Sequence, residues 1–384
     1  MTRDRRTAVV GVAESDLGVT ERSSFQLHAQ SVQRSLEDAG LTLQDVDGFA
    51  TAGAARFSAS AVCEYLGLRP SWMESTFEGG SSFELHLNRA TEAIGAGVCD
   101  VVVISYGSNQ RSAATRELGG VVHPHTPEAQ FEDPYGPLNP ISMYALAAQR
   151  HMYEFGTTPE QLAEVAVAAR SWALLNPAAY CFERGPLTVK DVVESPMVSS
   201  PLHRHDCCLV TDGGGAVVLT SMEQARDLRK TPVVVLGYGE TSTNVGMSQI
   251  SDLTTTGAVF SGQKAFAAAH RQPSDIDLAQ VYDSFTITVL LSLEALGFCK
   301  PGEGGDFVSG GRIAPGGSFP LNTSGGGLSY GHPGMFGIFL IVEAVRQLRN
   351  EAGTRQVPDV ATALIHGTGG CFSSHATAIL GVEG

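Results

Sequence analysis

The stretch that decides the fold is Asn322-Thr-Ser-Gly-Gly-Gly-Leu-Ser-Tyr-Gly-His-Pro333, near the carboxyl end of the chain. It holds four glycines, and glycine lets a backbone pass very close to a ligand. Pro333 stiffens the turn that presents the His332 imidazole, just before an apolar, helix-like run. The alternative is a glycine-rich turn with a solvated histidine. We favour a functional site, because a proline-fixed histidine beside so much glycine is rarely accidental.

Strand-like and helix-like runs alternate before and after this stretch. In the first part, strands at 7–12, 47–51 and 100–106 accompany a helix at 24–39 that ends at Gly40. After Thr231 the rhythm returns, with strands predicted at 232–237, 279–283, 360–366 and 374–380. The alternation predicts an α/β protein with a largely parallel, helix-covered sheet.

The two series of elements predict two similar halves. We expect a first half at 1–225 with a long insertion at about 107–200, and a second half at 226–384. The boundary falls near 222–230. Residues 107–139 within the insertion are rich in Pro, Gly and His and show no clear period, which is typical of a functional loop or a partner contact.

Composition limits the function classes. The chain has 384 residues, of which 43% are apolar and 17% charged, as in globular proteins. Its formal net charge of −15 argues against nucleic acid as a partner. An anionic CoA ester would have to bind through local cations or helix N-termini. We find no apolar run long enough to span a membrane and no apolar signal core, so we expect a cytoplasmic protein.

The cysteines and histidines do not predict a metal site. The seven cysteines are scattered and form no CxxC pair. His123 and His125 have a metal-like spacing but lack a third ligand. We therefore expect neither a metal nor another cofactor in this chain.

The decisive stretch resembles that of thiolases, especially thiolases of the sterol-carrier-protein type, which carry Gly-His-Pro after an Asn-x-Ser-Gly-Gly turn. Two further segments agree with this resemblance: the run 366–370, His-Gly-Thr-Gly-Gly, and the run 205–216, which ends Thr-Asp-Gly-Gly-Gly-Ala. The resemblance covers essentially the whole chain. It implies two βαβαβαββ-type halves in a five-layered αβαβα sandwich, and a homodimer formed through first-half strands.

The chain departs from thiolases at the nucleophile. A thiolase needs a Cys thiolate at the start of a buried helix in its first half. The resemblance places Phe77 there, ahead of Gly80, Ser81 and Ser82. A phenylalanine cannot be acylated. We interpret the two serines as helix-start caps, because no base for a serine nucleophile is visible nearby.

Two tyrosines stand at positions that the resemblance assigns to the reaction centre. Tyr282 replaces the first residue of the Asn-Glu-Ala-Phe or His-Asp-Cys-Phe motif, and Tyr330 directly precedes Gly331-His332-Pro333. The alternative is that both are ordinary half-buried tyrosines. Loss of the cysteine together with gain of two tyrosines resembles the thiolase-like aldolases that remove steroid side chains.

That resemblance implies a substrate class and partners. It implies retro-aldol cleavage of a β-hydroxy acyl-CoA, such as a 17-hydroxy steroid side-chain ester that yields a 17-ketosteroid and propionyl-CoA. It also implies a complex with a small OB-fold, zinc-ribbon protein that is fused to or bound with an enoyl-CoA hydratase. Any zinc would then lie in that partner.

Retro-aldol chemistry fits these residue types. The step needs a base for the β-hydroxyl, a site for the enolate oxygen and an acid for the new carbanion. We assign Tyr282 and Tyr330 as base and acid in an order left open, and His332 as support for the oxyanion. The CoA ester is expected at Gly325, Gly326, His366, Gly369 and Gly370.

Two other functions compete with this hypothesis. One is a catalytically inactive thiolase-like subunit that stabilises a partner or carries a lipid. The other is a Claisen-type acyltransferase with an unrecognised nucleophile, which would form an acylated protein. We favour the aldolase, because an inactive subunit has no reason to keep His332 together with both tyrosines.

Overall fold

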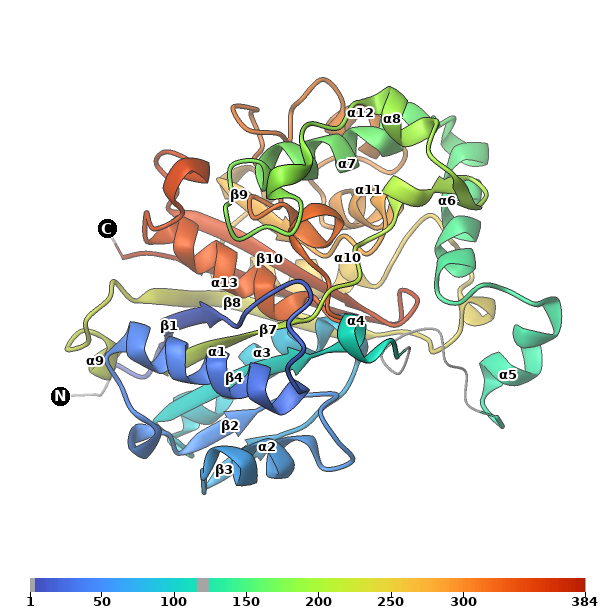
Figure 1. The fold of residues 1–384 in the computed structure, drawn as a ribbon. Coiled ribbons are helices and arrows are strands. Elements are labelled where there is room, and N and C mark those ends of the chain that lie inside the picture. Colours follow the sequence, from blue (N-terminus) through green and yellow to red (C-terminus); the bar gives the residue numbers. More distant parts are fainter. Residues whose placement is uncertain (1–3, 116–123, 384) are drawn as a thin grey trace.

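The computed structural model describes residues 4–115 and 124–383 (Figure 1). His123, one member of the metal-like pair, and part of the predicted insertion loop lie outside these residues. The described chain contains one nine-stranded sheet, in the order β3-β2-β4-β7-β1-β8-β11-β10-β9. Its first-half strands are β1 (Thr7–Glu14), β2 (Gly48–Ala50), β3 (Trp72–Glu74), β4 (Val101–Ser108) and β7 (Gly213–Ser221). Its second-half strands are β8 (Val233–Ser242), β9 (Leu278–Val281), β10 (Thr362–Gly369) and β11 (Ser374–Gly381).

The sheet order repeats on either side of the central β1–β8 pairing. Moving outward from the centre, the first half runs β1, β7, β4, β2 and then the edge strand β3. The second half runs β8, β11, β10 and β9. In the first half β1 lies beside β7, and β4 comes next; in the second half β8 lies beside β11, and β10 comes next. Each half thus places its first strand beside its last strand. The repeated order supports two similar halves, although the second lacks a counterpart of β3 among the described residues.

The expectation of a largely parallel sheet is wrong. β1 pairs antiparallel with β7 and β8, β7 with β4, and β11 with β8 and β10. Only the β2–β3, β2–β4 and β9–β10 pairings within the described chain are parallel. β11 returns on β10 through a short turn, and strands joined in this way run antiparallel. In the first half the long insertion between β4 and β7 brings the chain back antiparallel to β4.

The helices form the expected αβαβα layers. α1 (Ser24–Ala39) packs on β1, β4 and β7 of the first half, and α10 (Ala258–Ala269) packs on β8 and β11 of the second. α3 (Ser82–Ala96) and α13 (Gly337–Leu348) contact each other and strands of both halves. A helix that packs against both halves of the sheet must be apolar on most of its surface, and α13 is buried along almost its whole length.

The insertion between β4 and β7 packs on the second half, where α6 and α7 lie against α11 (Figure 1). Its elements are α4 (Gln110–Ala113), α5 (Pro127–Phe131), α6 (Ile141–Phe155), α7 (Pro159–Ala173), α8 (Val189–Val193), β5 (Met197–Ser199) and β6 (Leu202–His203). The remaining helices are α2 (Ser58–Leu66), α9 (Met222–Ala225), α11 (Thr286–Ala295) and α12 (Gly304–Val308). In the part of the chain that the structure describes, no helix is both long and apolar enough to cross a bilayer.

Candidate active site

Tyr282 and His332 lie together at the centre of the molecule. Tyr282 follows β9 directly, and its backbone N–H donates to the His366 carbonyl of β10 over 2.9 Å. Its hydroxyl lies 2.9 Å from Nε2 of His332 and accepts the backbone N–H of Phe336 over 3.1 Å. Both side chains are buried. Tyr282 and His332 are therefore in contact, and their catalytic roles stay a prediction.

The His332 turn is held by residues of the first half. His332 and Thr211 exchange two hydrogen bonds, from the His332 N–H to the Thr211 hydroxyl and from the Thr211 N–H to the His332 carbonyl. The Tyr106 hydroxyl donates to the carbonyl of Pro333. The imidazole is therefore fixed at the junction of the two halves.

Burial keeps this pair uncharged. It lowers the pKa of His332 to about 4, so the imidazole is neutral near pH 7. Burial also raises the pKa of Tyr282 well above its ordinary value, and the Phe336 N–H opposes that change by stabilising the phenolate. A neutral imidazole carries one proton on either nitrogen, so it can either accept the phenol proton or donate to the phenol oxygen.

Gly80 makes room for Tyr282 at the start of α3. A Cβ at this position would lie 2.3 Å from Cε2 of Tyr282 and 2.4 Å from the Thr368 carbonyl oxygen. Phe77, which the resemblance places at the nucleophile position, is instead 53% exposed. The residue of this segment that faces Tyr282 is therefore Gly80, and the alignment of Phe77 with the missing cysteine is not supported by the geometry.

Ser81 and Ser82 do not cap α3. The Ser82 hydroxyl accepts the Glu78 N–H and donates to the Gly79 carbonyl, and the Ser81 hydroxyl donates to the Glu78 carbonyl. Both hydroxyls therefore close the turn before the helix. Their engagement in this turn argues further against a serine nucleophile.

Tyr330 has a different set of partners. It ends the π-helical turn Gly326–Tyr330, and its hydroxyl lies 3.4 Å from Oε1 of Glu14 at the end of β1. The rings of Tyr330 and Tyr282 both pack on Phe336, at centroid distances of 6.3 and 6.2 Å. No hydrogen bond joins the two phenol hydroxyls among the described residues. The structure thus places both phenols around one aromatic ring but gives each its own polar partner.

Asp283 orders the glycine-rich turn. Its carboxylate accepts the N–H groups of Gly327 and Leu328 over 2.7 and 3.2 Å. Burial raises the pKa of this carboxyl to about 7, although the two N–H donors lower it. Gly326 has φ +61°, and a Cβ there would lie 2.1 Å from Oδ2 of Asp283. Only glycine fits this left-handed position against the carboxylate.

The other residues expected at the CoA ester lie in tightly packed backbone. A Cβ on Gly325 would meet Ala173 of α7 at 2.7 Å, and one on Gly369 would overlap the Glu78 carbonyl. Gly370 has φ +59°, and its carbonyl accepts the Tyr144 hydroxyl over 2.7 Å. These contacts explain the need for glycine by packing within the protein, so a role in CoA binding stays a prediction.

His366 contributes to the site through its backbone. Its imidazole is buried, bonds to the Thr377 hydroxyl through Nδ1 at 2.8 Å and stacks on His375. Burial and the neighbouring His375 lower the pKa of His366 well below its ordinary value. Its carbonyl positions the Tyr282 backbone, but its side chain is engaged elsewhere.

A buried carboxyl that the sequence did not single out lies one helical turn after Gly80. Glu84 is fully buried, and neither of its oxygens has a hydrogen-bond partner among the described residues. Gly337 and Gly367 leave space for it, because a Cβ on either would lie within 2.5 Å of Oε2. Burial raises the pKa of Glu84 to about 8, so it is mostly protonated near pH 7.

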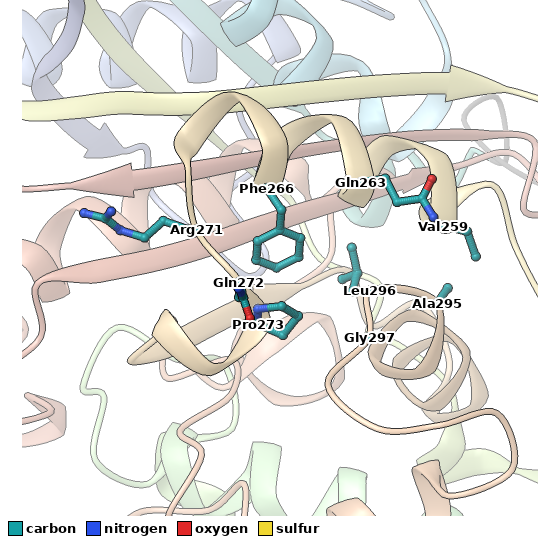
Figure 2. A pocket seen from close by; sticks show the side chains of 9 residues that line it. All are labelled: Val259, Gln263, Phe266, Arg271, Gln272, Pro273, Ala295, Leu296 and Gly297. Atoms are coloured by element: carbon teal, nitrogen blue, oxygen red, sulfur yellow. The ribbon is translucent and has the colours of Figure 1, made fainter.

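Tyr282 and His332 are 4% and 8% exposed, so the site is nearly closed to solvent. A cavity of about 360 Å³ lies between α10 and α11, where Phe266 and Leu296 face each other and Gln263 and Arg271 form the rim (Figure 2). It contains none of the residues predicted for the site. Residues 4–115 and 124–383 also hold no cluster of three or more His, Cys, Asp or Glu side chains able to bind a metal.

Comparison with known proteins identifies the family. Residues 239–382 match the family model described as thiolase C-terminal domain-like. The steroid side-chain-cleaving aldolase of Thermomonospora curvata is 35% identical over 94% of this chain and 95% of its own. The chain belongs to the thiolase superfamily.

Relatives of different activities lie within this superfamily. The 17-hydroxy-3-oxo-4-pregnene-20-carboxyl-CoA lyase of Mycobacterium tuberculosis is 34% identical over 90% of this chain and 92% of its own. An acetyl-CoA acetyltransferase of Methanothermobacter thermautotrophicus is 35% identical over 97% of this chain and 99% of its own. The solved Ltp2-ChsH2(DUF35) aldolase matches with a TM-score of 0.90 and 32% identity over 98% of each chain. The expected thiolase fold is confirmed.

Sequence reasoning missed four residues around the two phenols: Gly80, Phe336, Glu14, and Arg346, whose guanidinium pairs with the Glu14 carboxylate. Glu14 gave a weak signal, since it is a charged residue at the end of an apolar strand. Arg346 gave a second weak signal, since it is a charged residue within a largely apolar helix. Neither signal identifies a partner, because the contact between Glu14 and Tyr330 joins residues 316 positions apart.

Proposed function

We propose that this protein is a lyase that cleaves a carbon–carbon bond of a β-hydroxy acyl-CoA by a retro-aldol reaction. The observation that supports it is the contact of Tyr282 with Gly80 at the start of α3. The Tyr282 ring fills the space that a side chain on residue 80 would need, and its hydroxyl is bonded to His332 and the Phe336 N–H. The site therefore offers proton transfer in place of covalent acyl transfer.

The reaction needs two proton movements and one stabilised anion. A base removes the β-hydroxyl proton, the carbon–carbon bond breaks to leave a ketone and a thioester enolate, and an acid protonates the enolate carbon. Tyr282 and Tyr330 are the two proton-transfer residues in this proposal. Backbone N–H groups of the glycine-rich turns would donate hydrogen bonds to the enolate oxygen. His332 would donate another when its Nε2 is not hydrogen-bonded to Tyr282.

The proposed substrate is a 17-hydroxy steroid side-chain CoA ester that yields a 17-ketosteroid and propionyl-CoA. The names of the Thermomonospora aldolase and the Mycobacterium lyase support this class, since both relatives match over most of the chain. We propose that the CoA portion passes the turns at Gly325–Gly326 and Gly369–Gly370, beside His366. The pantetheine must then enter a site that is closed in this structure, because Tyr282 and His332 are only 4% and 8% exposed.

We further propose that the protein works as a homodimer in complex with a small OB-fold, zinc-ribbon protein. The solved relative that contains a DUF35 protein supports such a partner. An enoyl-CoA hydratase fused to or bound with that partner would supply the β-hydroxy acyl-CoA. In this proposal any zinc belongs to the partner, and the chain itself uses no cofactor.

An acyltransferase is the second candidate, favoured by the equal identity to an acetyl-CoA acetyltransferase. A nucleophilic cysteine must be a thiolate. Burial instead raises the pKa of Cys63 to about 11 and that of Cys99 to about 12, and it also raises the pKa of Cys208, which neighbours Tyr282. Mass spectrometry of the protein after incubation with an acyl-CoA tests this candidate, since only an acyltransferase gives an acylated chain.

The main test is ketone release. The chain is co-expressed with its candidate OB-fold partner and incubated with β-hydroxy acyl-CoAs of different bulk, and ketone and CoA ester are quantified by chromatography. We expect ketone and a shortened acyl-CoA in equal amounts from a bulky 17-hydroxy substrate. A complex that binds these esters without releasing ketone would instead support an inactive subunit or lipid carrier.

A further inference from the structure

Tyr330 faces an ion pair that no sequence motif marked. Two nitrogens of the Arg346 guanidinium on α13 bond the two carboxylate oxygens of Glu14, one of them over 2.5 Å. A bidentate pair of this kind fixes a carboxylate in both position and orientation. Oε1 of the fixed carboxylate is the atom that lies 3.4 Å from the Tyr330 hydroxyl.

The surroundings of Tyr330 keep its proton in place. Its side chain is buried against Phe336 and Phe339, and the other charged groups that act on it are Glu343 and Arg355, which pair with each other. Burial, followed by the negative charge of Glu14, raises the pKa of Tyr330 well above its ordinary value, while Arg346 acts in the opposite direction. Tyr330 is therefore a neutral phenol in the resting protein.

The direction of hydrogen bonding separates the two tyrosines. An ionised carboxylate can only accept, so the Tyr330 proton points at Glu14 and the lone pairs of its oxygen face away. Tyr282 differs, because its oxygen already accepts the Phe336 N–H, and its proton is free in the tautomer in which Nε2 of His332 donates to it. The Tyr330 oxygen, whose proton is directed at Glu14, keeps lone pairs to accept a substrate proton and suits a base. The Tyr282 hydroxyl, whose proton remains free to be donated, suits an acid.

We propose that Glu14, fixed by Arg346, is the proton acceptor behind Tyr330 and makes Tyr330 the base of the reaction and Tyr282 its acid. This inference rests on the proposed retro-aldol function. The β-hydroxyl proton moves to the Tyr330 oxygen while the Tyr330 proton moves to Oε1 of Glu14. The electron pair of the broken carbon–carbon bond enters the thioester enolate, whose carbon takes the Tyr282 proton. Glu14 is then protonated and Tyr282 ionised, and transfer of that proton through solvent after product release restores the resting state.

The alternative is that Glu14 only anchors the end of β1 to α13. The variant Glu14→Gln separates these roles, because its amide oxygen can still accept from Tyr330 and Arg346 but cannot take up a proton at neutral pH. A proton acceptor predicts a fall in kcat of about a hundredfold or more with little change in KM. An anchor predicts a lower unfolding temperature with kcat nearly unchanged.

Two further variants complete the experiment, which uses the complex with the OB-fold partner. Tyr330→Phe combined with Glu14→Gln should be no slower than either single variant, because both changes interrupt one proton path. Glu240→Gln is the matched control: Glu240 also pairs with a partly buried arginine, Arg89, at 2.5 Å, and its loss should leave kcat unchanged.

The outcomes distinguish this inference from the proposed function. An inactive wild-type complex contradicts the proposed function itself. An active wild type with Glu14→Gln within threefold of its kcat overturns only the role of Glu14, as does a double variant whose losses multiply. Should Glu14→Gln fail to fold, Glu14→Asp carries the test. It keeps a carboxylate beside Arg346 but lengthens the contact with Tyr330, so kcat should fall in the wild-type background and not in Tyr330→Phe.

Discussion

Replacing Gly80 by alanine tests the geometry on which the site depends. The added Cβ would lie 2.3 Å from Cε2 and 2.5 Å from Cζ of Tyr282. Non-bonded carbon atoms settle at about 3.5–4.0 Å, so the ring must move by roughly 1 Å or more. The backbone cannot move away instead, because the same Cβ would lie 2.4 Å from the Thr368 carbonyl.

A displacement of this size reaches the reacting group. The Tyr282 hydroxyl is held by contacts of 2.9 Å to His332 and 3.1 Å to the Phe336 N–H, and a 1 Å shift breaks at least one of them. A misplacement of about 1 Å can cost on the order of a hundredfold in rate. We therefore expect Gly80→Ala to lower kcat for ketone release by about a hundredfold. Crowding of the core should also lower the free energy of unfolding by about 1–3 kcal/mol.

The matched control is Gly95→Ala in α3, the helix that follows Gly80. A Cβ on Gly95 would meet nothing within 4 Å among the described residues. Alanine is favoured over glycine inside a helix by up to about 1 kcal/mol, so this variant should be slightly more stable and fully active. The assays are steady-state ketone release and urea unfolding of both variants. A folded Gly80→Ala complex with kcat within twofold of wild type would refute the contact between Gly80 and Tyr282.

The other predictions concern the two phenols and the buried carboxyl. Tyr282→Phe leaves the Phe336 N–H without its acceptor and should lower kcat by at least about a hundredfold, with bound acyl-CoA still detectable by calorimetry. Tyr330→Phe should lower turnover by at least about a hundredfold, and unchanged turnover would remove Tyr330 from the mechanism. Burial raises the pKa of Glu84 from 4.5 to about 8 in the folded chain, so the unfolded chain releases this proton at a lower pH. The stability that the neutral group gives is complete below about pH 4.5 and is lost as pH rises through about 8. Glu84→Gln should therefore unfold at a higher urea concentration than wild type at pH 8.5. If the wild-type chain had the same urea midpoint at pH 6 and at pH 8.5, the raised pKa of Glu84 would be contradicted.

Most helices and strands could be predicted, because caps, glycine stops and apolar periodicity lie within each segment itself. The helix at 24–39 ends where Gly40 adopts φ +75°, as the pattern indicates, but its capping box joins Ser23 and Gln26, one residue before the expected cap Ser24. The strand directions could not be predicted in the same way. Apolar periodicity identifies a buried strand but carries no information on the direction of its neighbours, so the antiparallel returns of β7 and β11 were missed.

The site could be predicted only where a motif carries it. His332 and Tyr282 were found through the resemblance, although 50 positions separate them. The partners that set their chemistry were not found, since the Phe336 N–H is a backbone group and Glu14 lies in the first half of the chain, whereas Tyr330 lies in the second. Such contacts depend on how β1, β9 and α13 are packed, which no single segment determines.

The glycine at residue 80 and the tyrosine at residue 282 depend on each other sterically. Any side chain at position 80 overlaps the Tyr282 ring, so a cysteine and this tyrosine cannot occupy their sites together. A fold that carries Tyr282 here must give up a nucleophile on that face of α3, and one that keeps the nucleophile needs a smaller residue at 282. The site of this chain can therefore hold the Tyr282 phenol at this position but not a nucleophilic side chain on residue 80.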